Sequence, residues 1–238
     1  LKIDHTYRVA ALCERIAKAA GMCAYDVELA WLSGMLHDVG RFEQIKRYNT
    51  FSDADSVDHA KFGADLLFKD GLISTFLNGM VKCTGYKPGA LEDRYSSDGV
   101  FLYDRLNKSD MEMLELAIRC HNMYRIPQGL NRREQAFCNV LRDADKVDIF
   151  KVNIDTPLEE IYNTTTEELM KSDITDEVLE AFDEEHCILK AIRRTPADTV
   201  IGHVSLAYEL VYDESVRITV EQGYLAKLMH FHSDNDET

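Results

Sequence analysis

The residues best suited to chemistry in this chain are the consecutive pair His37-Asp38, which follows an apolar run and precedes Gly40. A further histidine, His5, lies near the start of the chain, and Asp145 lies far downstream. Imidazole and carboxylate groups on separate helices are the ligands with which an all-helical protein holds a divalent metal ion. The sequence therefore points first to a metal centre and to hydrolysis by metal-activated water.

The position of the pair in its helix decides whether both side chains can face one ion. Consecutive residues on a regular helix diverge by about 100°, so His37 and Asp38 can converge only where a helix ends. Gly40 supplies such an end. An isolated His-Asp dipeptide is usually a surface pair, but the apolar run over 29–36 argues against exposure. We therefore expect the pair to be buried at a helix terminus.

The segments that carry these residues have helical periodicity. Apolar residues at helical spacing predict helices over about 2–20, 26–40, 58–67, 109–121 and 132–150. Only four prolines and twelve glycines interrupt the chain, and no pair of segments alternates as strands would. The sequence predicts an all-α protein in which His5, His121 and Asp145 lie on separate helices.

Helix ends are predicted from capping residues. The segment 41–57 is polar and aromatic and is predicted to be a loop, with Ser56 or Asp58 as the N-cap of the next helix. Ser109 to Glu112 predicts a capping box. Thr156-Pro157 and Thr195-Pro196 predict two later helix starts with Thr as N-cap. The pattern is weakest over 71–108.

The composition limits the environment and the partners. A net charge of −15 over 238 residues disfavours binding to a nucleic acid polymer. No apolar stretch is long enough to cross a membrane. The six cysteines are scattered singly, which favours a reducing cytoplasm. The chain begins without Met, so we expect the natural N-terminus to lie upstream.

The order of the motifs supports a family resemblance. His, then His-Asp, then Asp, each on a helix with an apolar stripe, resembles the HD superfamily of metal-dependent phosphohydrolases from about His5 through Asp148. The segment 58–64, Asp-His-Ala-Lys-Phe-Gly-Ala, is similar to the His-x-x-x-Gly-Ala helix of the dinuclear branches. The segment 117–121, ending in Cys120-His121, is similar to the helix end that carries another ligand. Each motif is short, so the resemblance to this family depends mainly on the order in which the motifs occur.

Carried over residue by residue, the resemblance implies a metal site and a fold. One ion would be surrounded by His5, His37, Asp38 and Asp145, and Asp38 would bridge to a second ion held by His59 and His121. Such ligands suit one or two divalent ions of Fe, Mn, Ni or Zn, with Mg as a further candidate. The implied fold is an HD-domain-like compact helical bundle, with a metal-binding core over 1–153 and a C-terminal helical extension over 154–238.

The resemblance also implies a reaction. A metal-activated hydroxide would attack phosphorus in a nucleotide or another small phosphorylated metabolite, with Asp38 as bridging ligand and secondary proton acceptor. Arg41 and Lys146 would stabilise the leaving phosphate. Lys46, Arg47 and Arg125 are further phosphate-binding candidates. A homodimer is one option for the assembly.

Other functions stay open at this stage. Cleavage of cyclic dinucleotides is disfavoured because Cys120 precedes His121 where that branch has paired histidines, and no Gly-Tyr-Pro signature is present. The branch that cleaves dinucleoside polyphosphates is closer. The same order of ligands also occurs in the HD-type diiron oxygenases, and a non-catalytic regulatory HD module is a third alternative. The remaining histidines, His186, His203, His230 and His232, are interpreted as structural or surface residues.

Overall fold

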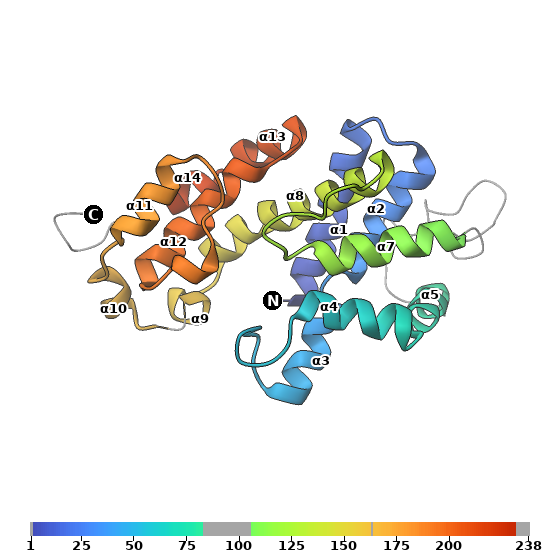
Figure 1. Ribbon diagram of the computed structural model, residues 1–238, viewed down its shortest axis with the longest axis horizontal. Coiled ribbons are helices and arrows are strands. Elements are labelled where there is room, and N and C mark those ends of the chain that lie inside the picture. Colours follow the sequence, from blue (N-terminus) through green and yellow to red (C-terminus); the bar gives the residue numbers. More distant parts are fainter. Residues whose placement is uncertain (1, 83–105, 163, 232–238) are drawn as a thin grey trace.

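The regular structure of this chain is entirely helical in the part described by the computed structural model, which comprises residues 2–82, 106–162 and 164–231 (Figure 1). The predicted all-α fold class is confirmed. The N-terminal elements are α1 (Lys2–Ala19), α2 (Ala24–Leu36), α3 (Val39–Tyr48), α4 (His59–Ala64), the π-helical turn η1 (Asp65–Lys69), α5 (Leu72–Lys82), α7 (Lys108–Cys120) and α8 (Arg132–Asp155).

The C-terminal elements are shorter and gather around the far end of α8 (left part of Figure 1). They are α9 (Leu158–Tyr162), α10 (Thr166–Met170), α11 (Asp176–Asp183), the 3₁₀ turn η3 (Lys190–Ile192), α12 (Pro196–Val204), the 3₁₀ turn η4 (Ser205–Glu209), α13 (Asp213–Gln222) and α14 (Tyr224–Met229). Of these, α13 returns along α8 toward the N-terminal helices (Figure 1).

Two hydrophobic clusters are joined by α8. The larger cluster is built mainly on α1, α2, α7 and the first part of α8, and it includes Ile16, Leu32, Leu114 and Leu141. The smaller cluster contains Phe150, Leu169, Val200, Val204 and Leu228. Since α8 runs through both clusters, it ties the two groups of helices together. The domain boundary expected between 153 and 154 falls inside α8 and stays a prediction.

Glycines bring the site-bearing helices into close contact. A Cβ on Gly34 of α2 would lie 2.6 Å from the Cα of Ala10 on α1, so glycine lets these two helices approach directly. A Cβ on Gly40 of α3 would lie 2.1 Å from the carbonyl oxygen of His59 and 2.8 Å from the nitrogen of Gly63 in α4. These contacts set the distances between the ends of α2, α3 and α4.

The segment 41–57 is predicted to be a loop, but its first half belongs to helix α3. α2 ends at Leu36, the chain turns at His37 and Asp38, and α3 begins at Val39. Gly40 therefore does not stop a helix; it is needed where α3 packs against the backbone of α4. Asn49, in the left-handed conformation at φ 54°, ends α3.

Two predicted caps are also wrong, while others are confirmed. The capping box of α7 is formed by Asn107 with Asp110, not by Ser109, because Asn107 has the extended backbone that an N-cap requires. Thr156 is the C-cap of α8, and its hydroxyl has no hydrogen-bond partner among the described residues. Asp58 caps α4, and Thr195 forms a capping box with Pro196 in the first turn of α12. Most of the weak segment, residues 83–105, lies outside the described residues.

Candidate metal centre

The six predicted metal ligands converge in one place. His5 lies on α1, His37 and Asp38 in the turn between α2 and α3, and His59 is the first residue of α4. His121 follows the end of α7, and Asp145 lies inside α8. The four imidazoles and Asp38 are buried, with 0–5% of their surface exposed. Chain segments far apart in sequence thus supply one buried cluster of imidazoles and carboxylates.

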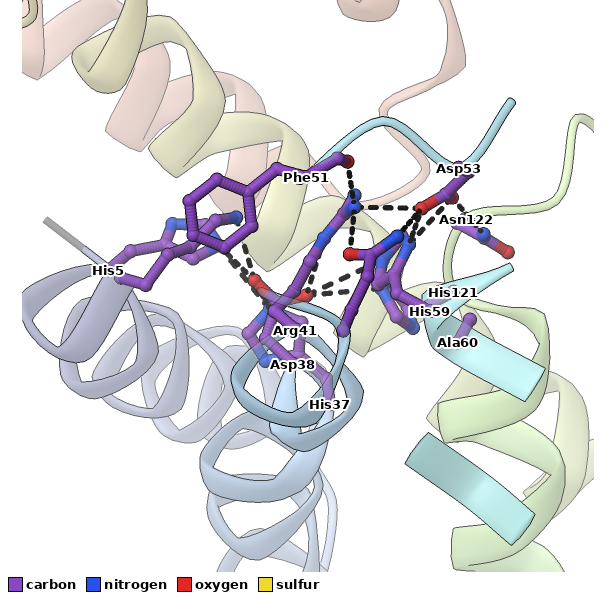
Figure 2. A network of polar contacts seen from close by, with 12 residues as sticks. His5, His37, Asp38, Arg41, Phe51, Asp53, His59, Ala60, His121 and Asn122 are labelled. Atoms are coloured by element: carbon purple, nitrogen blue, oxygen red, sulfur yellow. Dashed lines mark hydrogen bonds and ion pairs between the residues drawn. The ribbon is translucent and has the colours of Figure 1, made fainter. Parts of the chain in front are cut away.

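Asp38 lies between two pairs of histidines (Figure 2). Its Oδ2 is 3.7 Å from Nε2 of His5 and 3.7 Å from Nε2 of His37. Its Oδ1 is 3.4 Å from Nε2 of His59 and 3.9 Å from Nε2 of His121. Each carboxylate oxygen therefore faces a different pair, as a carboxylate bridging two ions would.

Asp145 lies within 4 Å of both histidines of the first pair. Its Oδ1 lies 3.2 Å from Nε2 of His5 and 3.9 Å from Nε2 of His37. The donors therefore form two groups that share Asp38: one with His5, His37 and Asp145, and one with His59 and His121. Both groups have the nitrogen and oxygen donors that divalent transition metals prefer.

The opposite ring nitrogen of each histidine has a hydrogen-bond partner. Nδ1 of His37 lies 2.7 Å from the carbonyl oxygen of Gly34, and Nδ1 of His121 lies 2.7 Å from that of Ile118. A carbonyl oxygen only accepts, so both rings donate from Nδ1 and present the lone pair of Nε2 to the centre. This is the tautomer that a metal ligand needs.

Carboxylates perform the same task for the other two rings. Nδ1 of His5 lies 2.6 Å from Oδ2 of Asp148, and Nδ1 of His59 lies 2.7 Å from Oδ2 of Asp53. A carboxylate behind a ligating imidazole fixes the orientation of the ring and raises its basicity. All four Nε2 atoms consequently face the centre.

The spacing of the nitrogens fits bound ions. Nε2 of His5 is 3.4 Å from Nε2 of His37, and Nε2 of His59 is 3.1 Å from Nε2 of His121. Two nitrogens at about 2.1 Å from one ion, at angles between 90° and 109°, lie roughly 3.0–3.4 Å apart. Two nitrogens held this close repel unless a proton or a metal ion lies between them, and these distances suit a metal ion in each group.

Burial sets the protonation of three of the imidazoles. It lowers the pKa of His37 and of His59, and it lowers the pKa of His121 to about 4. These rings are therefore neutral near pH 7, which metal binding requires.

His5 behaves differently. Burial alone would lower its pKa, but hydrogen bonds to Asp145 and Asp148 raise the pKa to about 9. Burial also opposes ionisation of Asp38 and Asp145, yet the neighbouring histidines, with Lys2 in addition at Asp38, hold the pKa of both carboxyls below the usual range. Without an ion, His5 thus carries the proton that compensates these carboxylates.

Several residues of the site were missed in the sequence. Lys2 donates from Nζ to Oδ2 of Asp38 at 2.8 Å, and its spacing three residues before His5 on one helix is the signal that would have found it. Asp148 is likewise three residues after Asp145 on α8. Asp53 carries no comparable signal, because it lies between α3 and α4 in a segment without periodicity.

Arg41 lies beside the cluster and links it to Asp53. Its Nη1 donates to Oδ1 of Asp53 at 2.8 Å and to the carbonyl oxygen of Phe51 at 2.5 Å (Figure 2). Its Nε is buried, lies 3.8 Å from Oδ1 of Asp38, and has no hydrogen-bond partner among the described residues. Arg41 is thus close enough to contact a group bound at the ions.

A cavity of about 430 Å³ opens onto the cluster, and both Arg41 and Lys146 line it. Nζ of Lys146 lies 3.2 Å from Oε2 of Glu209 in η4, and burial lowers the pKa of Lys146. Lys46 and Arg47 are exposed and pair with Glu43 instead, outside the lining of this cavity. Of the predicted phosphate-binding residues, Arg41 and Lys146 line this cavity, and Arg125 lines a second cavity instead.

Comparison with known proteins gives one match. The HD domain family model matches residues 3–150, more than half of the chain, and the matched region contains all six candidate ligands. The resemblance to the HD superfamily is thereby confirmed, and the closer similarity to its dinuclear branches stays a prediction. No curated protein and no solved structure matches the chain.

Two findings bear on the cellular environment. Among the helices of the described residues, none is both long and apolar enough to cross a membrane. The five described cysteines, Cys13, Cys23, Cys120, Cys138 and Cys187, are free thiols. The cytoplasmic location stays a prediction.

Proposed function

Because the chain belongs to the HD domain family, we propose that it is a phosphohydrolase that acts with two divalent metal ions. The observation that carries this proposal is the position of Asp38, whose two oxygens face different histidine pairs at 3.4–3.9 Å. A bridging carboxylate between two clusters of imidazole nitrogen is suited to holding two ions close together. The remaining carboxylate, Asp145, would complete the ligands of the first ion, together with His5, His37 and Asp38.

The surrounding residues suit a phosphate substrate. When bound, the ions would lower the pKa of water toward neutrality and offset charge on the phosphate oxygens. Asp38 would serve first as a ligand of both ions and second as an acceptor for the proton of the attacking water. Lys2, Arg41 and Lys146, which line the same cavity, donate charge-assisted hydrogen bonds to phosphate oxygens and to the leaving group.

The size of the cavity bears on the substrate. A volume of about 430 Å³ lies within the range for pockets that hold small organic ligands, and exceeds what a bare phosphate fills. The substrate proposed is therefore a small phosphoester or phosphoanhydride with an organic part, such as a nucleotide.

The deciding experiment measures turnover with defined metals. Protein freed of metal with a chelator is reloaded with Mn²⁺ under argon and assayed for phosphate release from a panel of phosphomonoesters and nucleoside di- and triphosphates. We expect release from part of the panel, and loss of both bound metal and activity in Asp38→Ala. Asp70→Ala, at an exposed carboxylate outside the site, serves as the matched control.

The outcomes separate the alternatives. Consumption of O₂ by an iron-loaded protein, with no phosphate release under argon, would identify an oxygenase. Metal binding at the six residues without turnover of any compound in the panel would identify a regulatory module. Full activity in Asp38→Ala would remove this residue from the centre.

A further inference from the structure

The cavity has a second end, formed by the C-terminal helices. Beyond the metal-ligand residues it continues to residues 187–193 and to His203 of α12. These residues lie outside the region matched by the family model, which ends at 150. The family match therefore says nothing about the chemistry of this second wall.

Arg193 is the main charged group at this end. Its Nη2 donates to the carbonyl oxygens of Ile188 at 2.6 Å and Gly202 at 3.2 Å. A Cβ on Gly202 would lie 2.2 Å from Cζ of Arg193, so the glycine makes room for the guanidinium. Nε of Arg193 is buried without a hydrogen-bond partner, and Arg193 forms no direct ion pair among the described residues. The Asp198 carboxylate attracts Arg193 from beyond ion-pair distance, and its oxygens accept hydrogen bonds from backbone N–H groups. A partly buried cation without a direct ion-pair partner is stabilised by binding an anion.

Two further polar groups accompany Arg193. Lys190 is exposed at the rim of the cavity and forms no ion pair with any described residue. His203 has a buried Nδ1 without a partner, and burial with the nearby charges of Arg193 and Lys190 lowers its pKa to about 3. The ring is therefore neutral and offers one N–H donor.

The nearest acidic side chain of the lining is already engaged. Glu209 accepts from Lys146 at 3.2 Å and from Arg142 at 3.4 Å. The lining also contains the apolar residues Ile149 and Val152, which follow Asp145 by about one and two turns on the same face of α8. In a chain with net charge −15, the part of the cavity lined by residues 187–203 thus presents positive side chains and no carboxylate among its lining residues.

We propose that Arg193, Lys190 and His203 form a second anion-binding subsite, which recognises a carboxylate or phosphate on the organic part of the substrate. The proposal rests on the proposed function for the metal end, where the phosphate to be cleaved binds. The substrate class is then a phosphate ester with a second anionic group beyond an apolar section. The subsite contributes to binding and specificity and touches no reacting atom.

Non-hydrolysable probes test this subsite by isothermal titration calorimetry of the Mn²⁺-loaded protein. Alkylphosphonates with three to six carbons are compared with ω-carboxyalkylphosphonates and alkane bisphosphonates of the same length. We expect at least tenfold tighter binding of the doubly anionic compounds at one chain length. Comparing the ω-carboxyalkylphosphonates with the bisphosphonates shows whether the subsite prefers a carboxylate or a phosphonate.

Variants assign the effect to the residues named. Arg193→Met and Lys190→Met should each remove most of the preference while binding of the alkylphosphonate and metal content stay unchanged. Lys190 is exposed, so its variant keeps the fold even if Arg193→Met does not. Lys46→Met, which changes an exposed lysine outside the cavity, is the control. No preference at any length, or a preference that persists in Lys190→Met and in folded Arg193→Met, overturns the proposal.

A second measurement is independent of the metal end. In metal-free protein with ¹⁵N-labelled histidine, inorganic phosphate and glutarate are titrated, and the ring resonances of His203 are followed. A saturable shift that Lys190→Met weakens supports the subsite even if alkylphosphonates fail to bind at the metals. The absence of any shift with both anions contradicts it and leaves the proposed hydrolase function untouched.

Discussion

Asp148 contacts the Nδ1 side of the His5 ring, with its Oδ2 2.6 Å from Nδ1. The other ring nitrogen, Nε2, faces the cluster of candidate ligands. Arg8 in turn binds the same carboxylate, with Nε 2.6 Å from Oδ1 and Nη2 2.9 Å from Oδ2. The arrangement is a chain from guanidinium to carboxylate to imidazole that joins α1 to α8. It fixes the rotation of the His5 ring, so Asp148 would position His5 for a metal ion without contacting the ion itself.

Substituting Asp148 should therefore weaken metal binding and leave the fold intact. We expect Asp148→Asn to lower affinity for Mn²⁺ by roughly 10–100-fold, because the amide supports the ring less strongly than the carboxylate. Asp155→Asn, at an exposed carboxylate on the same helix that pairs with Lys151, is the control. Calorimetric titration of metal-free protein measures the difference, and equal affinities in the two variants would show that Asp148 does not position His5.

The raised pKa of His5, about 9 in the absence of metal, predicts proton release on metal binding. At pH 7.5 the ring is protonated, and an ion must displace this proton from Nε2. Binding of Mn²⁺ should release about one proton, and the apparent affinity should rise about tenfold per pH unit up to pH 9. Calorimetry in buffers of different ionisation enthalpy measures the release, which His5→Asn should abolish. Heats that are independent of the buffer would contradict the protonation of His5.

The same pKa predicts how the metal-free protein responds to pH. The ordinary pKa of His5 is 6.5 and the folded value is about 9, so the folded state binds this proton more tightly. The resulting stabilisation is complete below pH 6.5 and is lost as the pH rises through 9, and it amounts to roughly 3 kcal/mol. Urea unfolding with a chelator at pH 6 and pH 9 should show a loss of this order, which His5→Asn should largely remove. Equal free energies of unfolding at both pH values in the unsubstituted protein would contradict the raised pKa of His5.

The candidate ligands were predictable from the sequence because their helices have strong apolar stripes. Periodicity places His5, His121 and Asp145 on separate helices, and family resemblance assigns them to one centre. Asp148 was not assigned, because the acidic residues of α8 have the spacing of a solvated face. Only the packing of α8 against α1 shows that Asp148 is buried.

The other features that the sequence did not predict have a common physical cause. Gly40 has the local signature of a helix stop, yet its function is a close contact with α4, which is distant in sequence. Asp53 and His203 come to the site through the path of a connecting segment and the docking of α12. Contacts between elements that share no periodicity leave no pattern in a single sequence.

The contact at Gly40 predicts that a single methyl group disrupts the centre. In Gly40→Ala the new Cβ would lie 2.1 Å from the carbonyl oxygen of His59, so α3 and α4 must separate. We expect a loss of about 3 kcal/mol or more of unfolding free energy together with a loss of bound metal. Gly21→Ala, at φ +73° with nothing within 4 Å, should cost about 1–2 kcal/mol and keep its metal. Retention of metal in Gly40→Ala would show that the approach of the two helices does not position His59.

The division of ligands around Asp38 predicts a difference in metal stoichiometry between variants. His59 faces only Oδ1 of Asp38, at 3.4 Å, while Oδ2 faces His5 and His37. His59→Ala should therefore lose one of two ions and retain the other, because the first group keeps its four donors. Asp38→Ala should lose both ions, since each group of donors depends on one oxygen of Asp38.

Elemental analysis after gel filtration of Mn²⁺-loaded protein gives the number of Mn²⁺ ions per protein chain. His230→Ala, at an exposed histidine outside the site, is the control. A ratio of one ion in the unsubstituted protein that His59→Ala does not change would show that His59 and His121 hold no ion and that Asp38 is a terminal ligand.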